Sequence, residues 1–120
     1  MAKRILVVDD EPDIIDVATT RLKYSGYEIV TAFNAEEAIV YLENGVCDLI
    51  LLDLLLPGMQ GDELCKKLKL DEKYKNIPVI LFTASAMDIA KVANDARADD
   101  YVTKPFEPNE LLSKINKFIG

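Results

Sequence analysis

The chain has 120 residues, half of them hydrophobic, which is enough for one hydrophobic core and too few for two ordinary domains. Its net charge of −7 and isoelectric point of about 4.5 argue against direct nucleic-acid binding, which needs a basic patch. No apolar run approaches the roughly 20 residues of a membrane span and the first residues lead directly into a strand pattern, so we expect one cytosolic domain over residues 1–120 with no membrane contact.

Apolar runs alternate with helical patterns along the whole chain. The runs at residues 4–8, 27–32, 48–53, 77–83 and 99–103 predict β-strands. The three central runs are continuously apolar, which is typical of strands that are covered on both faces. Five strand-helix units in this order predict an α/β fold with a doubly wound parallel sheet.

Four of the helical segments carry an apolar stripe for the core to cover. The first is expected to begin at Pro12 and to stop at Gly26, and the second to lie between Asn34, which pairs with Glu37 as a cap, and Gly45. The stripes consist of Ile14, Ile15, Ala18 and Leu22 in the first helix, Ala38, Ile39 and Leu42 in the second, Leu64 and Leu68 in the third, and Leu111, Leu112, Ile115 and Ile119 in the last.

The fourth helix is expected to be held less firmly. Ser85 with Asp88 suggests its cap, and its inward candidates are Ile89, Val92, Ala90, Ala93 and Ala96. Because alanine buries little apolar surface, this helix should be the most easily shifted one.

The two cysteines, Cys47 and Cys65, form neither a CxxC motif nor a metal-binding spacing. We expect reduced, partly buried thiols that carry no chemistry.

Polar residues stand where four of the predicted strands end. Asp9 and Asp10 follow the first strand, Asp53 ends the third, Thr83 ends the fourth, and Lys104 follows the fifth. Because the carboxyl ends of parallel strands meet at one edge of a sheet, these side chains should converge on one pocket.

This set of side chains favours a divalent cation and a phosphoryl group. Carboxylates crowded together need a cation among them, and oxygen ligands in a chain without histidine favour Mg²⁺ over zinc. A carboxylate can also attack phosphorus, and Asp53 on the middle strand is the best placed nucleophile. Lys104 with the cation could neutralise the phosphoryl oxygens, and Thr83 could donate a hydrogen bond to them.

Four stretches carry a family resemblance: LVVDDE at 6–11, DLILLDLLLPGMQG at 48–61, TA at 83–84 and ADDYVTKPF at 98–106. With them the chain resembles, from Arg4 to about Phe118, the receiver domains of bacterial two-component response regulators, a family that includes the stand-alone chemotaxis regulator. The resemblance implies a flavodoxin-like (βα)5 fold with strand order 2-1-3-4-5. It also implies that Asp53 is the phosphoacceptor.

The resemblance further implies how the metal and the phosphoryl group are held. Asp10 matches the direct metal ligand, Asp9 its partner acting largely through water, and the backbone carbonyl of Leu55 a further ligand. The ion is Mg²⁺, for which Mn²⁺ can substitute. Lys104 matches the lysine that pairs with the phosphoryl oxygens, before a peptide bond to Pro105 that is cis in the family.

Thr83 and Tyr101 match the family's switch pair. Thr83 would move toward the phosphoryl group and let Tyr101 turn inward, which would change the surface of the fourth helix, fifth strand and fifth helix. The resemblance implies that this surface reports to a downstream protein or to an output domain outside this chain, as a monomer or as a dimer formed on phosphorylation.

The chain departs from the family pattern on that same surface. The segment between Thr83 and Lys104 is one residue shorter than usual, and Arg97 stands where a glycine commonly ends the fourth helix. Either Arg97 adopts a left-handed conformation, at a cost of roughly 1–2 kcal/mol, or the shorter connection avoids that turn.

Two positions should modulate hydrolysis of the acyl phosphate. Leu55, two residues after Asp53, and Ser85, two after Thr83, match positions that line the path of the attacking water. We expect Leu55 to limit hydrolysis without sealing the site.

The chain has no histidine, so its phosphoryl donor must be a partner histidine kinase, a histidine phosphotransfer domain or a small acyl phosphate. The domain would catalyse its own phosphorylation and, slowly, its dephosphorylation, without being a conventional enzyme. An aspartate-dependent phosphohydrolase is disfavoured because Leu55 replaces the second acid, and a flavin carrier because acidic residues follow the first strand. The remaining alternative is an interaction module of the same fold that is not phosphorylated.

Overall fold

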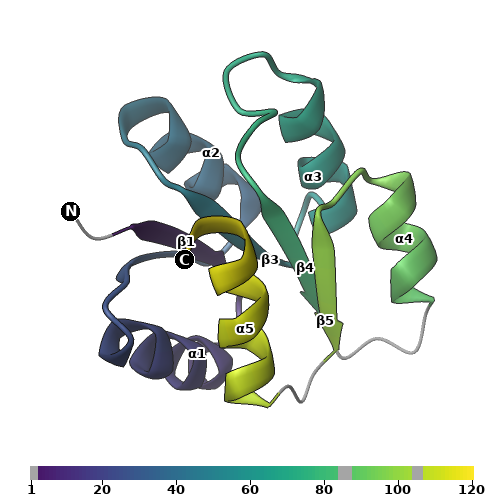
Figure 1. Ribbon diagram of the computed structural model, residues 1–120. Coiled ribbons are helices and arrows are strands. Elements are labelled where there is room, and N and C mark those ends of the chain that lie inside the picture. The colour runs from purple at the N-terminus through teal and green to yellow at the C-terminus, as the bar shows by residue number, and fades with distance from the viewer. Residues whose placement is uncertain (1–2, 84–87, 104–106) are drawn as a thin grey trace.

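The computed structural model describes residues 3–83, 88–103 and 107–120, without the side chains of residues 12–15, 17, 18, 83 and 108. Strands and helices alternate along these residues (Figure 1). The elements are β1 (Arg4–Val8), α1 (Pro12–Tyr24), β2 (Glu28–Ala32), α2 (Ala35–Asn44), β3 (Leu49–Asp53), α3 (Gly61–Leu70), β4 (Val79–Thr83), α4 (Ile89–Asp95), β5 (Asp100–Thr103) and α5 (Pro108–Ile119).

The strands form one parallel sheet with the order β2-β1-β3-β4-β5. Helices α1 and α5 cover one face of this sheet, and α2, α3 and α4 cover the other (Figure 1). The doubly wound fold and its strand order are therefore confirmed. Four of the strands begin one or two residues later than expected, whereas their carboxyl ends lie as predicted.

Each face of the sheet has its own buried cluster. Alternate residues of a strand point to opposite faces, so Leu6, Ile50 and Leu52 join α2, α3 and α4 while Ile5, Leu49 and Leu51 join α1 and α5. All five residues of β3 are buried, as expected for the central strand of a doubly wound sheet.

The helix boundaries follow from local capping chemistry. The side chain of Asn34 accepts a hydrogen bond from the Glu37 amide at 2.8 Å, and the Glu37 carboxylate accepts one from the Phe33 amide at 2.7 Å. This reciprocal pair confirms the predicted start of α2. At the end of α1, Gly26 has φ = 98° and donates to the carbonyl of Lys23, which satisfies a free carbonyl of the last turn.

Helix α4 differs from the expectation in two respects. It begins at Ile89, and Asp88 is its cap, with a side chain that accepts a hydrogen bond from the Lys91 amide at 3.2 Å; Ser85 lies outside the described residues. Ala90, expected to face inward, is exposed, because a helix that buries Ile89 and Ala93 turns the next position about 100° away.

The turn after α4 resolves the alternatives for Arg97. Arg97 has φ = 62°, so it adopts the left-handed conformation. Its amide donates to the Asn94 carbonyl at 3.1 Å and the Ala98 amide donates to the Ala93 carbonyl at 2.9 Å. These two hydrogen bonds form the helix ending that glycine ordinarily provides.

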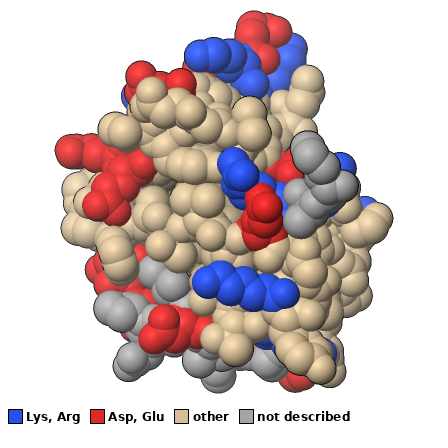
Figure 2. Space-filling model, turned by 90° about the vertical axis from the view of Figure 1, so that its left-hand side faces the viewer, with Lys and Arg blue, Asp and Glu red and all other residues tan. Residues whose placement is uncertain are grey.

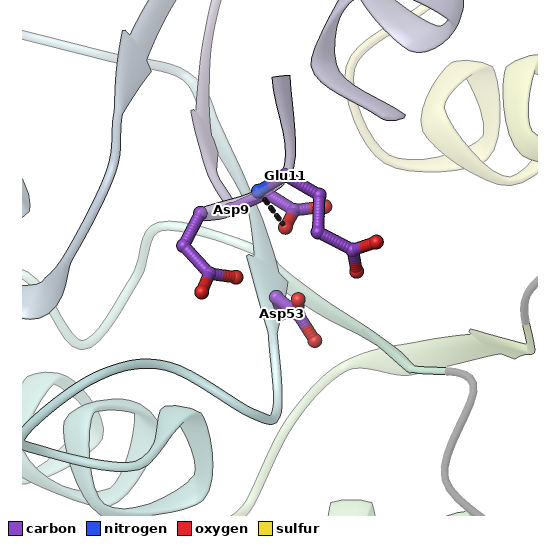
Figure 3. A group of neighbouring side chains, drawn as sticks. Asp9, Glu11 and Asp53 are labelled. Atoms are coloured by element: carbon purple, nitrogen blue, oxygen red, sulfur yellow. Dashed lines mark hydrogen bonds between the residues drawn. The ribbon is translucent and has the colours of Figure 1, made fainter. Parts of the chain in front are cut away.

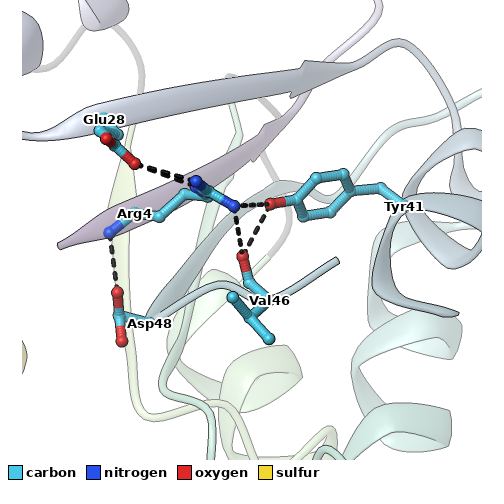
Figure 4. A network of polar contacts seen from close by, with 5 residues as sticks. All are labelled: Arg4, Glu28, Tyr41, Val46 and Asp48. Atoms are coloured by element: carbon cyan, nitrogen blue, oxygen red, sulfur yellow. Dashed lines mark hydrogen bonds and ion pairs between the residues drawn. The ribbon is translucent and has the colours of Figure 1, made fainter. Parts of the chain in front are cut away.

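The amino-terminal edge of the sheet is tied together through Arg4 (Figure 4). Its backbone amide donates to the Asp48 carboxylate at 2.8 Å, and its guanidinium pairs with Glu28 at 3.1 Å and donates to the Tyr41 hydroxyl at 3.2 Å. The Tyr41 hydroxyl in turn donates to the Val46 carbonyl at 2.7 Å. These contacts join β1 to β2 and to the segment before β3, at the opposite end of the strands from the predicted pocket.

Both cysteines are free thiols, as expected. Burial raises the pKa of the Cys47 thiol and of the Cys65 thiol to about 11. Both therefore stay protonated near neutral pH, which disfavours reactions that need a thiolate.

On the side of the molecule shown in Figure 2, acidic and basic groups are interspersed among uncharged ones. None of the described helices is long and apolar enough to span a membrane.

Candidate functional site

Four carboxylates meet at the carboxyl-terminal edge of the sheet (Figure 3). Asp9, Asp10 and Glu11 follow β1, and Asp53 is the last residue of β3. Each offers one oxygen, and these oxygens all lie within 4.8 Å of one another. The structure thus brings together three residues predicted from the sequence and adds a fourth, Glu11.

The parallel sheet holds the two inner carboxylates of this acidic cluster. Asp9 is fully buried, and its amide donates to the Ala32 carbonyl of β2 at 3.0 Å. Asp53 is 3% exposed, and the Leu54 amide that follows it donates to the Phe82 carbonyl of β4 at 3.1 Å. Each residue is therefore fixed by the strand next to its own.

The loops add a hydrogen bond to each of these carboxylates. The Glu11 amide donates to Asp9 Oδ1 at 3.0 Å, and the Leu55 amide donates to Asp53 Oδ1 at 3.1 Å. A backbone amide two residues along the chain thus orients each side chain.

Gly61, the first residue of α3, lies directly against the backbone of Asp53. A Cβ atom at this position would stand 2.0 Å from the Asp53 carbonyl oxygen, and the Gly61 amide donates to the Leu54 carbonyl at 2.9 Å. Only glycine lets α3 start so close to the end of β3. Gly61 belongs to the stretch that carries the family resemblance, but local sequence patterns alone give it no role.

The sequence signal for Glu11 was its position directly after the aspartate pair. This position alone predicts no place in the cluster, because the direction of a loop cannot be deduced from spacing. In the structure Glu11 precedes α1 and its carboxylate joins those of Asp9 and Asp53 (Figure 3).

The acidic cluster fits a hard divalent cation. All four groups offer oxygen, two of them, Asp9 and Asp53, are buried, and Asp10 and Glu11 are exposed to solvent. Buried like charges this close are costly without a compensating cation, and carboxylates with water suit the octahedral preference of Mg²⁺. The residues present thus match the expected ion.

The remaining predicted residues are described only in part. Thr83 ends β4 opposite Thr103 of β5, at the same edge of the sheet, but its side chain lies outside the described part of the chain, as do Lys104 and Ser85. Leu55 is 48% exposed. Tyr101 pairs in register with Leu81 and is half-buried on β5.

Comparisons with known proteins agree with this arrangement. The family model of the response regulator receiver domain matches residues 5–116. The chain is 41% identical over 116 residues to the phosphate regulon transcriptional regulatory protein PhoB of Pseudomonas aeruginosa, a match that covers 96% of this chain and 51% of that protein. The chain thus spans about half the length of this relative.

Two solved structures of receiver domains are similar to this chain. A CheY-like response regulator receiver domain protein from Methanospirillum hungatei JF-1 is 36% identical, with a TM-score of 0.89 over 98% of this chain and 93% of that one. The receiver domain of the sensor histidine kinase PA1611 from Pseudomonas aeruginosa PAO1 is 28% identical, with a TM-score of 0.90 over 100% of this chain and 99% of that one. That structure has a magnesium ion coordinated in its active site cleft. The fold, the acidic cluster and these matches together establish that the chain belongs to the response regulator receiver domain family of two-component systems.

Proposed function

We propose that Asp53 accepts a phosphoryl group in a Mg²⁺-dependent reaction and that the acyl phosphate changes the surface formed by α4, β5 and α5. The observation that carries this proposal is the placement of Asp53, buried at the end of the central strand with three other carboxylates within 4.8 Å. A buried carboxylate beside a site for a cation is suited to act as a nucleophile toward phosphorus.

The donor is a phosphohistidine of a partner kinase or phosphotransfer domain, since this chain contains no histidine. An oxygen of Asp53 forms the new bond to phosphorus while the phosphorus–nitrogen bond breaks. The electron pair of that bond goes to the imidazole nitrogen, which then takes a proton from solvent. The product is an acyl phosphate that water later hydrolyses.

The acidic cluster would hold the cation from several directions. Asp10, Asp53 and the carbonyl of Leu55 would bind it directly, and Asp9 would act largely through water. Bound there, Mg²⁺ supplies positive charge to the oxygens of the transferred group. The Leu55 amide donates to Asp53 Oδ1 at 3.1 Å and so fixes the orientation of the carboxylate that would attack phosphorus.

Lys104 and Thr83 complete the site in this proposal. The ammonium group of Lys104 would pair with the phosphoryl oxygens, and the Thr83 hydroxyl would donate to them. Movement of Thr83 would let Tyr101 turn, so that the switch pair carries the state of Asp53 to the edge of the sheet.

We further propose that residues 1–120 form a single cytosolic receiver domain without direct nucleic-acid binding. Its output is a downstream protein or a domain outside this chain, reached as a monomer or as a dimer through α4, β5 and α5.

Phosphorylation by a small donor tests the proposal. The wild type should gain one phosphoryl group from acetyl phosphate or phosphoramidate when Mg²⁺ is present, and neither Asp53→Asn nor the wild type in chelator should do so. Asp95→Asn, an exposed aspartate at the end of α4, is the matched control and should be labelled like the wild type. An unlabelled wild type in Mg²⁺ would favour the alternative of an interaction module that is not phosphorylated.

A further inference from the structure

A cluster of side chains at the edge of the sheet surrounds Tyr101. Among the described strands, β5 lies at the edge of the sheet and pairs with β4, and α5 lies beside it (Figure 1). An edge strand presents backbone amides and carbonyls that lack a partner strand. At Tyr101 two side chains form hydrogen bonds with these backbone groups.

Asp100 and Lys114 hold both backbone groups of Tyr101. The Tyr101 amide donates to Asp100 Oδ1 at 2.8 Å, and Lys114 Nζ donates to the Tyr101 carbonyl at 3.0 Å. Lys114 Nζ also pairs with the same Asp100 oxygen at 3.0 Å. The three residues thus form a closed clamp on the free side of β5.

The ammonium group of Lys114 also lies over the ring of Tyr101. The distance from Nζ to the ring centroid is 5.4 Å, within the range of a cation–π interaction. The ring packs against the buried cluster on the α2, α3 and α4 face, whereas α5 covers the other face, so Lys114 extends around the edge of the sheet to reach it. The side chains of Lys114 and Asp100 are only 27% and 17% exposed, so water screens these contacts incompletely.

These contacts differ in how they depend on the position of the ring. The backbone and carboxylate contacts of Lys114 can persist when the Tyr101 side chain rotates, because they do not involve it. The contact with the ring is lost once the ring turns away. Of the contacts that Lys114 makes, the one with the ring distinguishes one Tyr101 rotamer from another.

We propose that Lys114 is a positioning residue that stabilises the Tyr101 rotamer seen here and so opposes the switch. This inference rests on the proposed function, in which phosphorylation of Asp53 drives Tyr101 to a different rotamer. A ligand that favours the second state must work against this contact. Removal of the Lys114 ammonium group therefore raises the affinity of the protein for a phosphoryl analogue. The factor is the one by which this removal shifts the equilibrium between the two Tyr101 rotamers.

The test compares the affinity of Lys114 variants for beryllofluoride in excess Mg²⁺. Lys114→Met should bind beryllofluoride at least about 2–5-fold more tightly than the wild type, because that range corresponds to an exposed cation–π contact and Lys114 is only partly exposed. Lys114→Arg keeps a cation and should resemble the wild type. Lys117→Met is the matched control on the same helix and should bind beryllofluoride like the wild type. Lys117 is exposed, and its Nζ lies 5.6 Å from the centroid of the Phe118 ring, so this variant removes a comparable contact that does not involve Tyr101.

NMR of protein labelled with ¹³C in its tyrosine rings reports the rotamer directly, with the Tyr101 signal assigned from Tyr101→Phe. In Lys114→Met without ligand this signal should move part of the way toward its position in the wild type bound to beryllofluoride. A folded Lys114→Met with unchanged or weaker affinity, in which the Tyr101 signal does not move, would overturn the role of Lys114 as a positioning residue. A wild type that fails to bind beryllofluoride would instead overturn the proposed function itself.

Discussion

The backbone of Leu55 contacts Asp53, and the residue is exposed to solvent. Its amide donates to Asp53 Oδ1 at 3.1 Å, and the residue is 48% exposed. In the proposed mechanism, an apolar group in this position would partly exclude the water that attacks the acyl phosphate and could not orient it. The backbone contact should survive substitution of the side chain.

Leu55→Asn should therefore shorten the lifetime of phosphorylated Asp53 by roughly 2–10-fold, since an amide can hold a water that leucine cannot. The decay of the phosphorylated form after removal of the donor measures this lifetime. Leu55→Met, which keeps an apolar side chain, should decay like the wild type. Equal lifetimes in Leu55→Asn and the wild type would refute the role of this side chain.

Arg97 and Gly26 end their helices in the same way with different residues. After α1, Gly26 at φ = 98° donates to Lys23 and Tyr27 donates to Leu22; after α4, Arg97 at φ = 62° donates to Asn94 and Ala98 donates to Ala93. The left-handed conformation costs a residue with a Cβ roughly 1–2 kcal/mol, a cost that Gly26 avoids.

Arg97→Gly should stabilise the protein by about 0.5–1 kcal/mol, because relief of this strain exceeds the added chain entropy of glycine in the unfolded state. A shift of this size corresponds to a rise of roughly 2–5 °C in the melting temperature. Arg97→Ala keeps the Cβ and should give no such rise. The explanation fails if the melting temperature of Arg97→Gly equals that of the wild type.

At the scale of the elements, the start of α3 is coupled to the end of β3 through Gly61. A Cβ there would lie 2.0 Å from the Asp53 carbonyl oxygen and 2.9 Å from the Leu54 Cα, so backbone atoms rather than a flexible side chain would have to move. Gly61→Ala should cost about 1–3 kcal/mol of stability, as overpacking does, and should slow phosphorylation of Asp53 in the protein that remains folded. Asp62→Ala, one residue further along α3, serves as the control. Phosphorylation of Gly61→Ala at the wild-type rate would show that this contact does not position Asp53.

Helix α4 is the shortest of the described helices. It has seven residues and buries Ile89 and Ala93, whereas α3 has ten and buries Leu64, Cys65 and Leu68 together with Gly61. Hydrogen exchange measured by mass spectrometry should therefore be faster in α4 than in α3, because local opening exposes less apolar surface there. Protection of α4 equal to that of α3 would contradict the view of α4 as the element most easily shifted.

The boundaries of these helices show what local sequence could predict. Asn34 and Glu37 stand in the one arrangement that a reciprocal cap allows, and the structure has that cap. Ser85 and Asp88 are both cap formers three residues apart, so local chemistry could not decide between them; in the structure Asp88 is the cap and α4 begins at Ile89. For Arg97 the sequence left two geometries open, since the cost of a left-handed residue depends on tertiary contacts that spacing does not reveal.

At the scale of the whole molecule, the strand order decides which residues meet. The β1–β3 pairing in the middle of the sheet brings Asp9 and Asp53, far apart in sequence, to one edge, as the alternation of apolar runs predicted. The sequence could not predict that Glu11 joins them or that Gly61 packs on Asp53, because both depend on the course of loops between elements. Similarly, the contact of Lys114 with Tyr101 reaches around the sheet from α5, and no local pattern anticipates it.

The central claim is that Asp53 is the residue that becomes phosphorylated. Borohydride reduces an acyl phosphate to an alcohol and so converts a phosphorylated aspartate into homoserine, which peptide mass spectrometry locates in the chain. After incubation with acetyl phosphate and Mg²⁺, we predict homoserine at position 53, and unmodified aspartate there when Mg²⁺ is chelated. Homoserine at Asp9 or Asp10 instead, or unmodified aspartate at all three positions in the presence of Mg²⁺, would contradict the assignment.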